Sequence, residues 1–110
     1  MSNEQYQSCI DACKTCAEVC EQCAKACIEE KPKMMARCIA LDEDCAEFCR
    51  LAVHFMQRDS EFCDLIVEDC AEICAECAGE CARHSNEHCQ KCAATCRKCA
   101  EACMKMATVH

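Results

Sequence analysis

The residues best suited to chemistry in this chain are its cysteines, which number 19 among 110 residues. Between residues 9 and 27 they recur at steps of four, three, four, three and four residues, and between residues 89 and 103 at steps of three, four, three and four. These alternating steps average about 3.5 residues, so the thiols project from one face of a helix. The spacing therefore predicts helices with buried seams of sulfur, where a helical bundle ordinarily places leucine and isoleucine.

Four helices are needed to position these seams. One Gly and one Pro interrupt the sequence, and helix-forming residues dominate it. We predict helices over about residues 3–30 and 60–82, a second helix that follows a turn at residues 30–33 and ends at about residue 57, and a fourth from about residue 86 onward. Short turns between long helices favour antiparallel neighbours. The chain is therefore expected to be a single domain, residues 1–110, with an all-α fold: an antiparallel up-down-up-down four-helix bundle with a cysteine-lined core.

The expected turns carry signals for the starts of helices. The segment Glu30-Lys31-Pro32-Lys33 is expected to be a turn, with Pro32 at or just before the first turn of the second helix, because its fixed φ fits there and its missing N–H is not needed. Asp59 or Ser60 is expected to cap the third helix, and Ser85 or Asn86 the fourth.

Antiparallel packing lets the seams align in layers that take one residue from each helix. The expected layers are Cys16, Cys49, Cys70 and Cys99; Cys20, Cys45, Cys74 and Cys96; Cys23, Asp42, Cys77 and Cys92; and Cys27, Cys38, Cys81 and Cys89. The other end of the seams is expected to be closed by Ala52, Met56, Val67 and Met106, with Phe55 and Phe62 nearby. One end of the core should therefore be rich in sulfur and the other partly filled with carbon, even if the register slips by one step.

Several uses of so many inward-facing thiols can be weighed. As small hydrophobes alone they would leave a tube of unfilled volume, which costs about 24 cal/mol per Å3 in a packed helical core. A disulfide framework needs fewer cysteines, an even number of them and an oxidising compartment. The run Cys9-x3-Cys13-x2-Cys16 matches an iron–sulfur triad of radical enzymes, but it repeats inside helices and follows from their periodicity.

Metal binding remains, and charge favours copper(I). Thiolates are the ligands, and a dry core tolerates them only if bound cations cancel their charge. Zinc in a four-thiolate site leaves a net charge of about −2, whereas one copper(I) ion per thiolate leaves the core near neutral. Copper(I) prefers sulfur, and two or three thiols can hold it. We expect multiple Cu(I) ions per chain on Cys9, Cys13, Cys16, Cys20, Cys23, Cys27, Cys38, Cys45, Cys49, Cys63, Cys70, Cys74, Cys77, Cys81, Cys89, Cys92, Cys96, Cys99 and Cys103.

Charge and the N-terminal residues bear on partners and location. The formal net charge of −8 comes from 20 acidic and 12 basic side chains that are interleaved along the chain. Without a basic stripe, nucleic acid and anionic membranes are poor partners. The first residues show no basic start followed by an apolar stretch, and no apolar run approaches the ~18 residues of a membrane span. We therefore expect a cytoplasmic protein, in a compartment where thiols stay reduced.

The cysteine pattern resembles, over essentially the whole chain, the bacterial four-helix-bundle copper storage proteins, in particular their cytosolic branch. The resemblance is carried by the stretch Leu41-Asp42-Glu43-Asp44-Cys45, by three single cysteines (Cys38, Cys63 and Cys89) and by eight Cys-x3-Cys pairs. The pairs are Cys9/Cys13, Cys16/Cys20, Cys23/Cys27, Cys45/Cys49, Cys70/Cys74, Cys77/Cys81, Cys92/Cys96 and Cys99/Cys103. The resemblance implies sequestration of many copper(I) ions by thiolates and a homo-oligomer, a tetramer of bundles; a copper chaperone is a candidate partner.

Weaker metal-binding candidates flank the sulfur-rich end. His84 and His88 lie on either side of the last turn, and Met34 and Met35 lie in the first. Imidazole and thioether bind copper(I) more weakly than thiolate, which suits capture of an ion that enters at this end; capping or surface roles are the alternative. Asp42 occupies a seam position, so its carboxylate is expected either to cap a cluster or to turn toward solvent.

We therefore expect a non-enzymatic copper(I) store. Its helices should form before metal binds, because the alanine-rich sequence has high helix propensity. The alternatives that the sequence leaves open are a thiol redox protein or oxidant sink, and a buffer for zinc or another soft metal.

Overall fold

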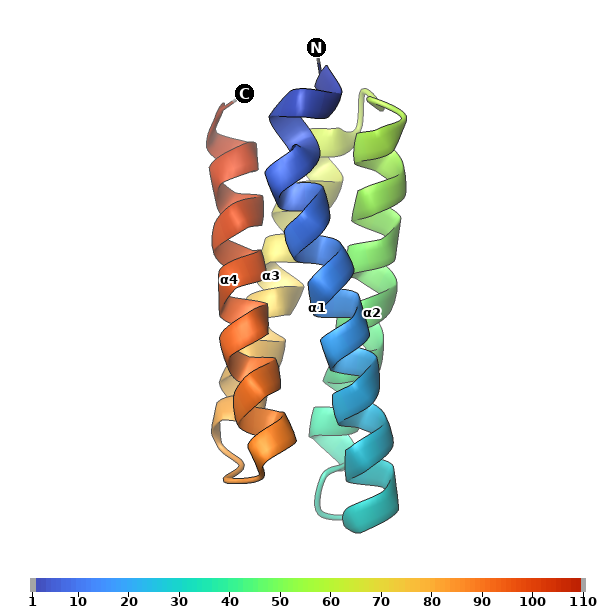
Figure 1. Ribbon diagram of the computed structural model, residues 1–110, viewed down its shortest axis with the longest axis vertical. Helices are drawn as coiled ribbons and strands as arrows, with labels where there is room; N and C mark the ends of the chain where they lie inside the picture. Colours follow the sequence, from blue (N-terminus) through green and yellow to red (C-terminus); the bar gives the residue numbers. More distant parts are fainter. Residues whose placement is uncertain (1, 110) are drawn as a thin grey trace.

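The computed structural model describes the backbone of residues 2–109 and the side chains of residues 6–107. The chain forms four helices (Figure 1): α1 (Ser2–Glu30), α2 (Ala36–Gln57), α3 (Cys63–Ala82) and α4 (Glu87–Val109). Between residues 2 and 109 there is no strand. The predicted all-α fold is confirmed.

The helices form an elongated antiparallel bundle of 45 × 18 × 18 Å. Helices α1 and α3 each pack against both α2 and α4. The α1–α2 and α3–α4 turns lie at one end of the bundle, the lower end in Figure 1, which we call the rim end. The α2–α3 turn lies at the opposite end, together with the start of α1 and the end of α4, and we call this the closed end.

The turn between α1 and α2 is longer than predicted. Helix α2 begins at Ala36, so Pro32 lies in the turn as one of the predicted alternatives has it, but the turn extends beyond the predicted Lys33. The backbone N–H of Met35 donates to the oxygen of Lys31 (3.1 Å). This turn directs the Met35 side chain into the core and leaves Met34 76% exposed. Burial of one methionine stabilises a fold by about 1.5–3 kcal/mol, which favours the turn over an earlier start of the helix.

The turn at the closed end reverses the chain through Asp59, which adopts a φ of 52°. Asp tolerates this left-handed conformation better than most residues. The Ser60 hydroxyl accepts a hydrogen bond from the backbone N–H of Phe62 (3.1 Å), but α3 begins at Cys63 and Phe62 occupies its N-cap position. The prediction that Asp59 or Ser60 caps α3 is therefore wrong, because additional turn residues separate them from the helix.

The α3–α4 turn lies where the sequence predicts it. The carbonyl of Asn86 accepts a hydrogen bond from the N–H of Gln90 (3.0 Å), so Asn86 occupies the N-cap position of α4. Its side chain reaches across the bundle end, where Nδ2 donates to the carboxylate of Glu30 (2.9 Å). This contact ties the end of α1 to the start of α4.

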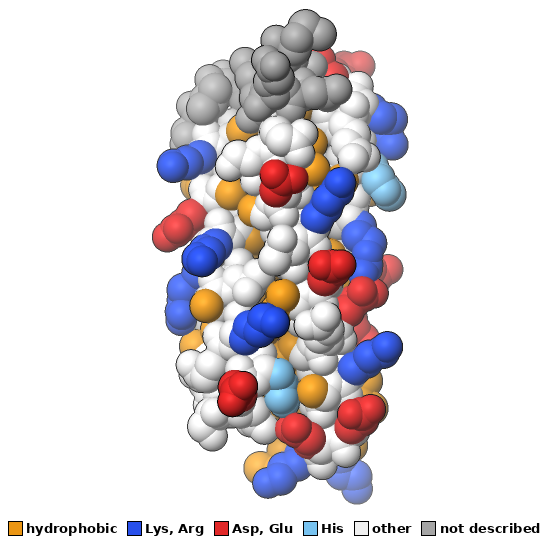
Figure 2. Space-filling view, viewed as in Figure 1, with side chains coloured by type: hydrophobic (Ala, Val, Ile, Leu, Met, Phe, Trp, Pro, Cys, Tyr) orange, Lys and Arg blue, Asp and Glu red, His pale blue; other side chains and the backbone are white. Residues whose placement is uncertain are grey.

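The interior is built from cysteine and alanine. All 19 cysteines are buried free thiols. Buried alanines on each helix, such as Ala17, Ala46, Ala71 and Ala93, let the backbones approach one another across the narrow core. On the face seen in Figure 2, charged side chains of both signs are dispersed. Within residues 2–109, no helix combines the length and apolar character that crossing a membrane requires.

Candidate metal centre

Eighteen of the cysteines form a continuous array of sulfur along the bundle axis. Each has its Sγ 3.5–4.0 Å from the Sγ of at least one other. The helices place them there because steps of three and four residues keep one face turned inward along each helix. We call this set, every cysteine except Cys63, the sulfur column.

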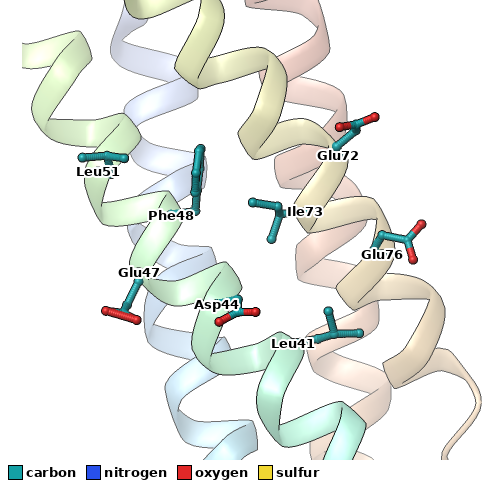
Figure 3. A pocket seen from close by; sticks show the side chains of 8 residues that line it. All are labelled: Leu41, Asp44, Glu47, Phe48, Leu51, Glu72, Ile73 and Glu76. Atoms are coloured by element: carbon teal, nitrogen blue, oxygen red, sulfur yellow. The ribbon is translucent and has the colours of Figure 1, made fainter.

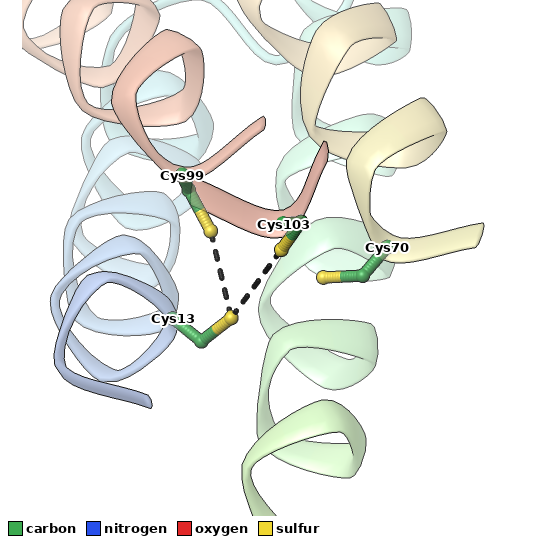
Figure 4. Close-up of side chains that lie close together, drawn as sticks. All are labelled: Cys13, Cys70, Cys99 and Cys103. Atoms are coloured by element: carbon green, nitrogen blue, oxygen red, sulfur yellow. Dashed lines mark hydrogen bonds between the residues drawn. The ribbon is translucent and has the colours of Figure 1, made fainter. Parts of the chain in front are cut away.

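Sulfurs of the column gather in groups of four whose atoms all lie within 4.8 Å of one another. These groups include Cys13, Cys70, Cys99 and Cys103; Cys16, Cys49, Cys74 and Cys99; Cys16, Cys20, Cys45 and Cys96; Cys20, Cys77, Cys92 and Cys96; and Cys23, Cys27, Cys38 and Cys89. In the first (Figure 4), the Sγ of Cys13 lies 3.6 Å from that of Cys99 and 3.8 Å from that of Cys103. Cys99 also belongs to the second group, and Cys16 to the second and third. Because members are shared, the column is one donor array and not a row of separate sites.

The predicted layers are confirmed in part. Contacts within them include Cys49–Cys70 (3.8 Å) and Cys38–Cys81 (3.5 Å). However, Cys74, which was expected one layer away from Cys49, lies 3.7 Å from it. A step of three or four residues advances a helix by about 4.5–6 Å, so thiols on four helices are staggered in height. A thiol such as Cys49 therefore contacts a sulfur of its own layer, that of Cys70, and a sulfur of a neighbouring layer, that of Cys74.

Asp42 lies inside the column and is fully buried. Its Oδ1 accepts hydrogen bonds from the thiols of Cys77 (3.1 Å), Cys92 (3.3 Å) and Cys81 (3.4 Å). Burial raises the pKa of Asp42 to about 10, and the neighbouring Cys92 and Cys77 act in the same direction. The predicted turn of this side chain toward solvent is therefore wrong, and the carboxylate points inward to the sulfurs of the column.

His88 connects the rim end with the column. Its Nδ1 lies 3.6 Å from the sulfurs of Cys23 and Cys89 and 3.9 Å from that of Cys27. Its Nε2 lies 3.0 Å from Oε1 of Glu30. The hydrogen bond with His88 is the main cause that lowers the pKa of Glu30. The imidazole therefore has a carboxylate on one side and three thiols on the other.

His84 has different surroundings. Its Nε2 lies 2.8 Å from Oε2 of Glu80, which is 8% exposed. The other carboxylate oxygen of Glu80 contacts the guanidinium groups of Arg37 (3.0 Å) and Arg83 (3.7 Å). The hydrogen bond with His84 is the main cause that lowers the pKa of Glu80. His84 thus belongs to an ion-pair network that joins α2 and α3, whereas His88 contacts the column.

The chain also matches known proteins in sequence and fold. Residues 2–108 match the family described as copper storage protein. The chain belongs to this family. Among solved structures, the Cu(I)-bound copper storage protein BsCsp3 is 45% identical and has a TM-score of 0.89, with 93% of this chain and 97% of that chain covered. A cytosolic copper storage protein from Streptomyces lividans, described with five coppers, is 35% identical and has a TM-score of 0.92, with 97% of this chain and 95% of that chain covered.

A further relative of this copper storage family member is YhjQ of Bacillus subtilis (strain 168), described as an uncharacterized cysteine-rich protein. It is 46% identical over 61 residues, which span 54% of this chain and 56% of YhjQ. The aligned part is thus little more than half the length of this curated relative. Membership of the family confirms the predicted resemblance and the predicted class of function, copper storage.

Apolar side chains fill the core at the closed end. Met56 and Val67 are buried completely or nearly so, Ala52 is fully buried, and Met106 is buried as well. The predicted closure of this end is therefore confirmed for these residues. The contribution expected from Phe62 is wrong, because this side chain lies in the turn ahead of α3 and is 55% exposed.

Cys63, also at the closed end, differs from the sulfur column. Its Sγ donates a hydrogen bond to the backbone oxygen of Phe55 (3.1 Å). Burial raises its pKa, and Tyr6 interacts with the thiol. Burial likewise raises the pKa of Tyr6 to about 12, and the phenol donates to Asp59 (3.3 Å). The hydrogen bond of the Cys63 thiol thus connects the start of α3 with the last turn of α2.

A groove lies on the outside of the bundle between α2 and α3, and its lining contains no thiol (Figure 3). It has a volume of about 750 Å3 and is lined by Leu41, Asp44, Glu47, Phe48, Leu51, Glu72, Ile73 and Glu76. Its floor is apolar and its carboxylates come from both helices. The groove is therefore separate from the candidate metal centre, which lies inside the bundle.

Sequence reasoning missed two residues that organise the rim end, Glu30 and Glu80, and it expected Asn86 only as a helix cap, not as a donor to Glu30. The pattern places Glu30 only at the end of a helix. One signal was available, because an acid at the C-terminal residue of a helix lies at the negative end of the helix dipole. Such an acid is expected to find donors elsewhere, and here Asn86 and His88 supply them.

Proposed function

We propose that the sulfur column is the copper(I) store and that its 18 thiolates supply most of the ligands, with Asp42 inside the column and His88 at the rim end as further donors. The observation that supports this assignment is the sharing of members between four-thiol groups. Separate tetrahedral sites use four ligands each, whereas shared thiolates allow more ions per thiol. The function is binding and release, without catalysis, by one domain that spans residues 1–110.

Copper(I) is favoured over zinc by charge and not by distance. Sulfur separations of 3.5–4.0 Å also suit zinc, whose Zn–S bonds of about 2.3 Å give a tetrahedral S···S edge of about 3.8 Å. Each zinc in a four-thiolate site would leave a net charge of about −2 inside a buried column, where solvation cannot offset it. One monovalent ion per thiolate leaves no such excess of negative charge in the column.

Each copper ion must replace thiol protons. Burial raises the pKa of Cys27 to about 11 and also raises that of Cys89. These rim thiols are therefore protonated near neutral pH, and before metal binds they fill the core as small apolar groups. Because thiolate is the ligand, loading releases protons, and the apparent affinity for copper(I) falls as the pH falls.

Copper enters at the rim end in this proposal. His88 offers a nitrogen beside three thiols there, and the partly exposed side chain gives it access to solvent. Met35 is buried and offers a thioether sulfur to copper(I) at the same end. Met34, which is exposed, and His84, which is hydrogen-bonded to Glu80, are auxiliary donors to the ion. At the closed end an ion would meet apolar side chains and lose its ligands without finding new ones.

The cellular setting follows from the family resemblance. The relative from Streptomyces lividans is described as cytosolic, and the cytosol keeps thiols reduced; we assign this protein to the same compartment. Association into tetramers and delivery of the metal by a copper chaperone are the remaining parts of the proposal. Neither nucleic acid nor membrane is proposed as a partner, because the chain carries a net charge of −8.

Titration of the reduced protein with copper(I) against a strong chelator tests the storage function. Saturation is expected well above about four or five ions, which is the number that separate four-thiolate sites would give. Saturation at that lower number, or a preference for zinc, would contradict storage of copper(I). A defined, reversible set of disulfides after exposure of the metal-free protein to air would instead favour a thiol redox protein or oxidant sink.

A further inference from the structure

The carboxylate of Glu30 receives two donors from the start of α4. Its Oε1 accepts a hydrogen bond from Nδ2 of Asn86 (2.9 Å) and lies 3.0 Å from Nε2 of His88. Asn86 is the N-cap residue of α4 and His88 lies in its first turn, so both donors belong to one short segment. Glu30 ends α1, where the helix dipole disfavours an acid. Contacts across the bundle end therefore hold this carboxylate, and its own helix does not.

These contacts determine which nitrogen of His88 carries the proton. An ionised carboxylate can only accept hydrogen bonds, so Nε2 must be the donor in the pair with Glu30. A neutral imidazole has a single N–H, which leaves a free lone pair on Nδ1. That nitrogen lies 3.6 Å from the sulfurs of Cys23 and Cys89, which are buried members of the column.

We propose that Glu30 is a positioning residue for copper capture: it holds His88 in the Nε2–H tautomer, so that Nδ1 presents its lone pair to copper(I) beside Cys23 and Cys89. The inference rests on the proposed storage function and names the arrangement that receives the ion. Metal-binding histidines generally donate their second ring N–H to a carboxylate or a carbonyl. Such a partner fixes the orientation of the ring and raises the basicity of the nitrogen that binds the metal.

His84 provides a contrast within the same end of the molecule. It also pairs with a carboxylate, but Glu80 is shared with Arg37 and Arg83 and joins α2 to α3. The Glu30 carboxylate instead takes its donors from Asn86 and His88 at the start of α4. A substitution at Glu30 should consequently change the tautomer of the His88 imidazole and lower the affinity for copper(I) at this end.

Long-range 1H–15N NMR spectra of the reduced, metal-free protein test the tautomer without copper. At mildly alkaline pH, the neutral imidazole of His88 should carry its proton on Nε2. Glu30→Ala should give a mixture of tautomers, whereas Glu30→Gln should keep the Nε2–H form, because its amide oxygen can still accept. Glu29→Ala removes a neighbouring exposed acid and is the matched control, with an unchanged spectrum expected. An unchanged His88 tautomer in Glu30→Ala would overturn the proposal.

Copper capture by the same variants provides the second readout, with copper(I) supplied by a weak chelator complex. Glu30→Ala should lower the affinity of the rim site by about 10-fold or more, as is usual when the partner of a metal-binding histidine is removed, and Glu30→Gln should recover most of it. On a His88→Ala background, Glu30→Ala should have no further effect, because the two residues act together. Losses that add in full would overturn the positioning role. The number of ions at saturation should match between the Glu30 variants and the unmodified protein; a low number in the unmodified protein would count against storage itself.

Discussion

The thiol of Cys77 donates a hydrogen bond of 3.1 Å to Oδ1 of Asp42, which is fully buried in the interior of the bundle. Asp42 occupies a position on the seam of α2 that the spacing of Cys38 and Cys45 assigns to a buried residue. Burying an ionised carboxylate is costly, and the pKa of Asp42 is accordingly raised from 3.8 to about 10. The carboxyl group therefore keeps a proton at neutral pH in the metal-free protein.

Asp42→Asn should stabilise the metal-free protein at neutral pH. The folded state keeps a proton that the unfolded state loses above pH 3.8, so the stability linked to this proton is fully present below that pH and is lost as the pH rises toward about 10. Asparagine removes this loss, with an expected gain in the free energy of unfolding of roughly 2–4 kcal/mol at pH 7. Urea unfolding at about pH 4 and about pH 8 measures it. A gain of equal size at both pH values would show that titration of Asp42 is not its cause.

The two rim histidines should respond differently to substitution by alanine. His88→Ala should slow uptake of copper(I), because it removes the nitrogen that lies 3.6 Å from Cys23 and Cys89. His84→Ala should mainly lower the melting temperature, because it removes a partner of Glu80 in the network between α2 and α3. Stopped-flow uptake and thermal unfolding should be measured on both variants. Equal uptake rates in the two variants would contradict the assignment.

Cys63 should contribute least to copper capacity among the cysteines. Its Sγ bonds to the Phe55 carbonyl, whereas Cys16 belongs to two of the four-thiol groups. Cys63→Ser should therefore leave the number of bound ions unchanged, and Cys16→Ser should lower it, with serine preserving the size of each side chain. Chelator titration gives both numbers, and circular dichroism confirms that both variants are folded. If Cys63→Ser lost more bound copper ions than Cys16→Ser, the Cys63 thiol would belong to the copper store.

Gly79→Ala should stabilise the bundle. Gly79 lies within α3 and is exposed, and a Cβ added there would meet nothing within 4 Å. Glycine in an exposed helix interior costs about 1 kcal/mol relative to alanine. An increase of about that size in the free energy of unfolding of the metal-free protein is expected, with unchanged copper capacity. Destabilisation would mean that another element packs closely against α3 at this point.

The sequence was most informative where structure depends on local spacing. Alternating steps of three and four residues predicted the inward-facing thiols of the first and last helices, and helix-forming residues with turn signals completed the prediction of four helices. The start of α2 could not be predicted because it depends on burial of Met35, and the stagger of Cys74 depends on the relative heights of separate helices. The pairing of Glu30 with His88 joins residues that are 58 positions apart. The spacing of residues within one helix gives no information about such a contact.

The central claim is that the sulfur column itself holds the metal, with thiolates shared between neighbouring ions. Anomalous scattering at the copper edge, from crystals of the fully loaded reduced protein, tests it most directly. We predict a row of copper positions along the bundle axis, with thiols such as Cys16 and Cys99 next to more than one ion and with Asp42 beside the row. Isolated ions that each have four thiols of their own, or copper on the outer surface with the column empty, would contradict the claim.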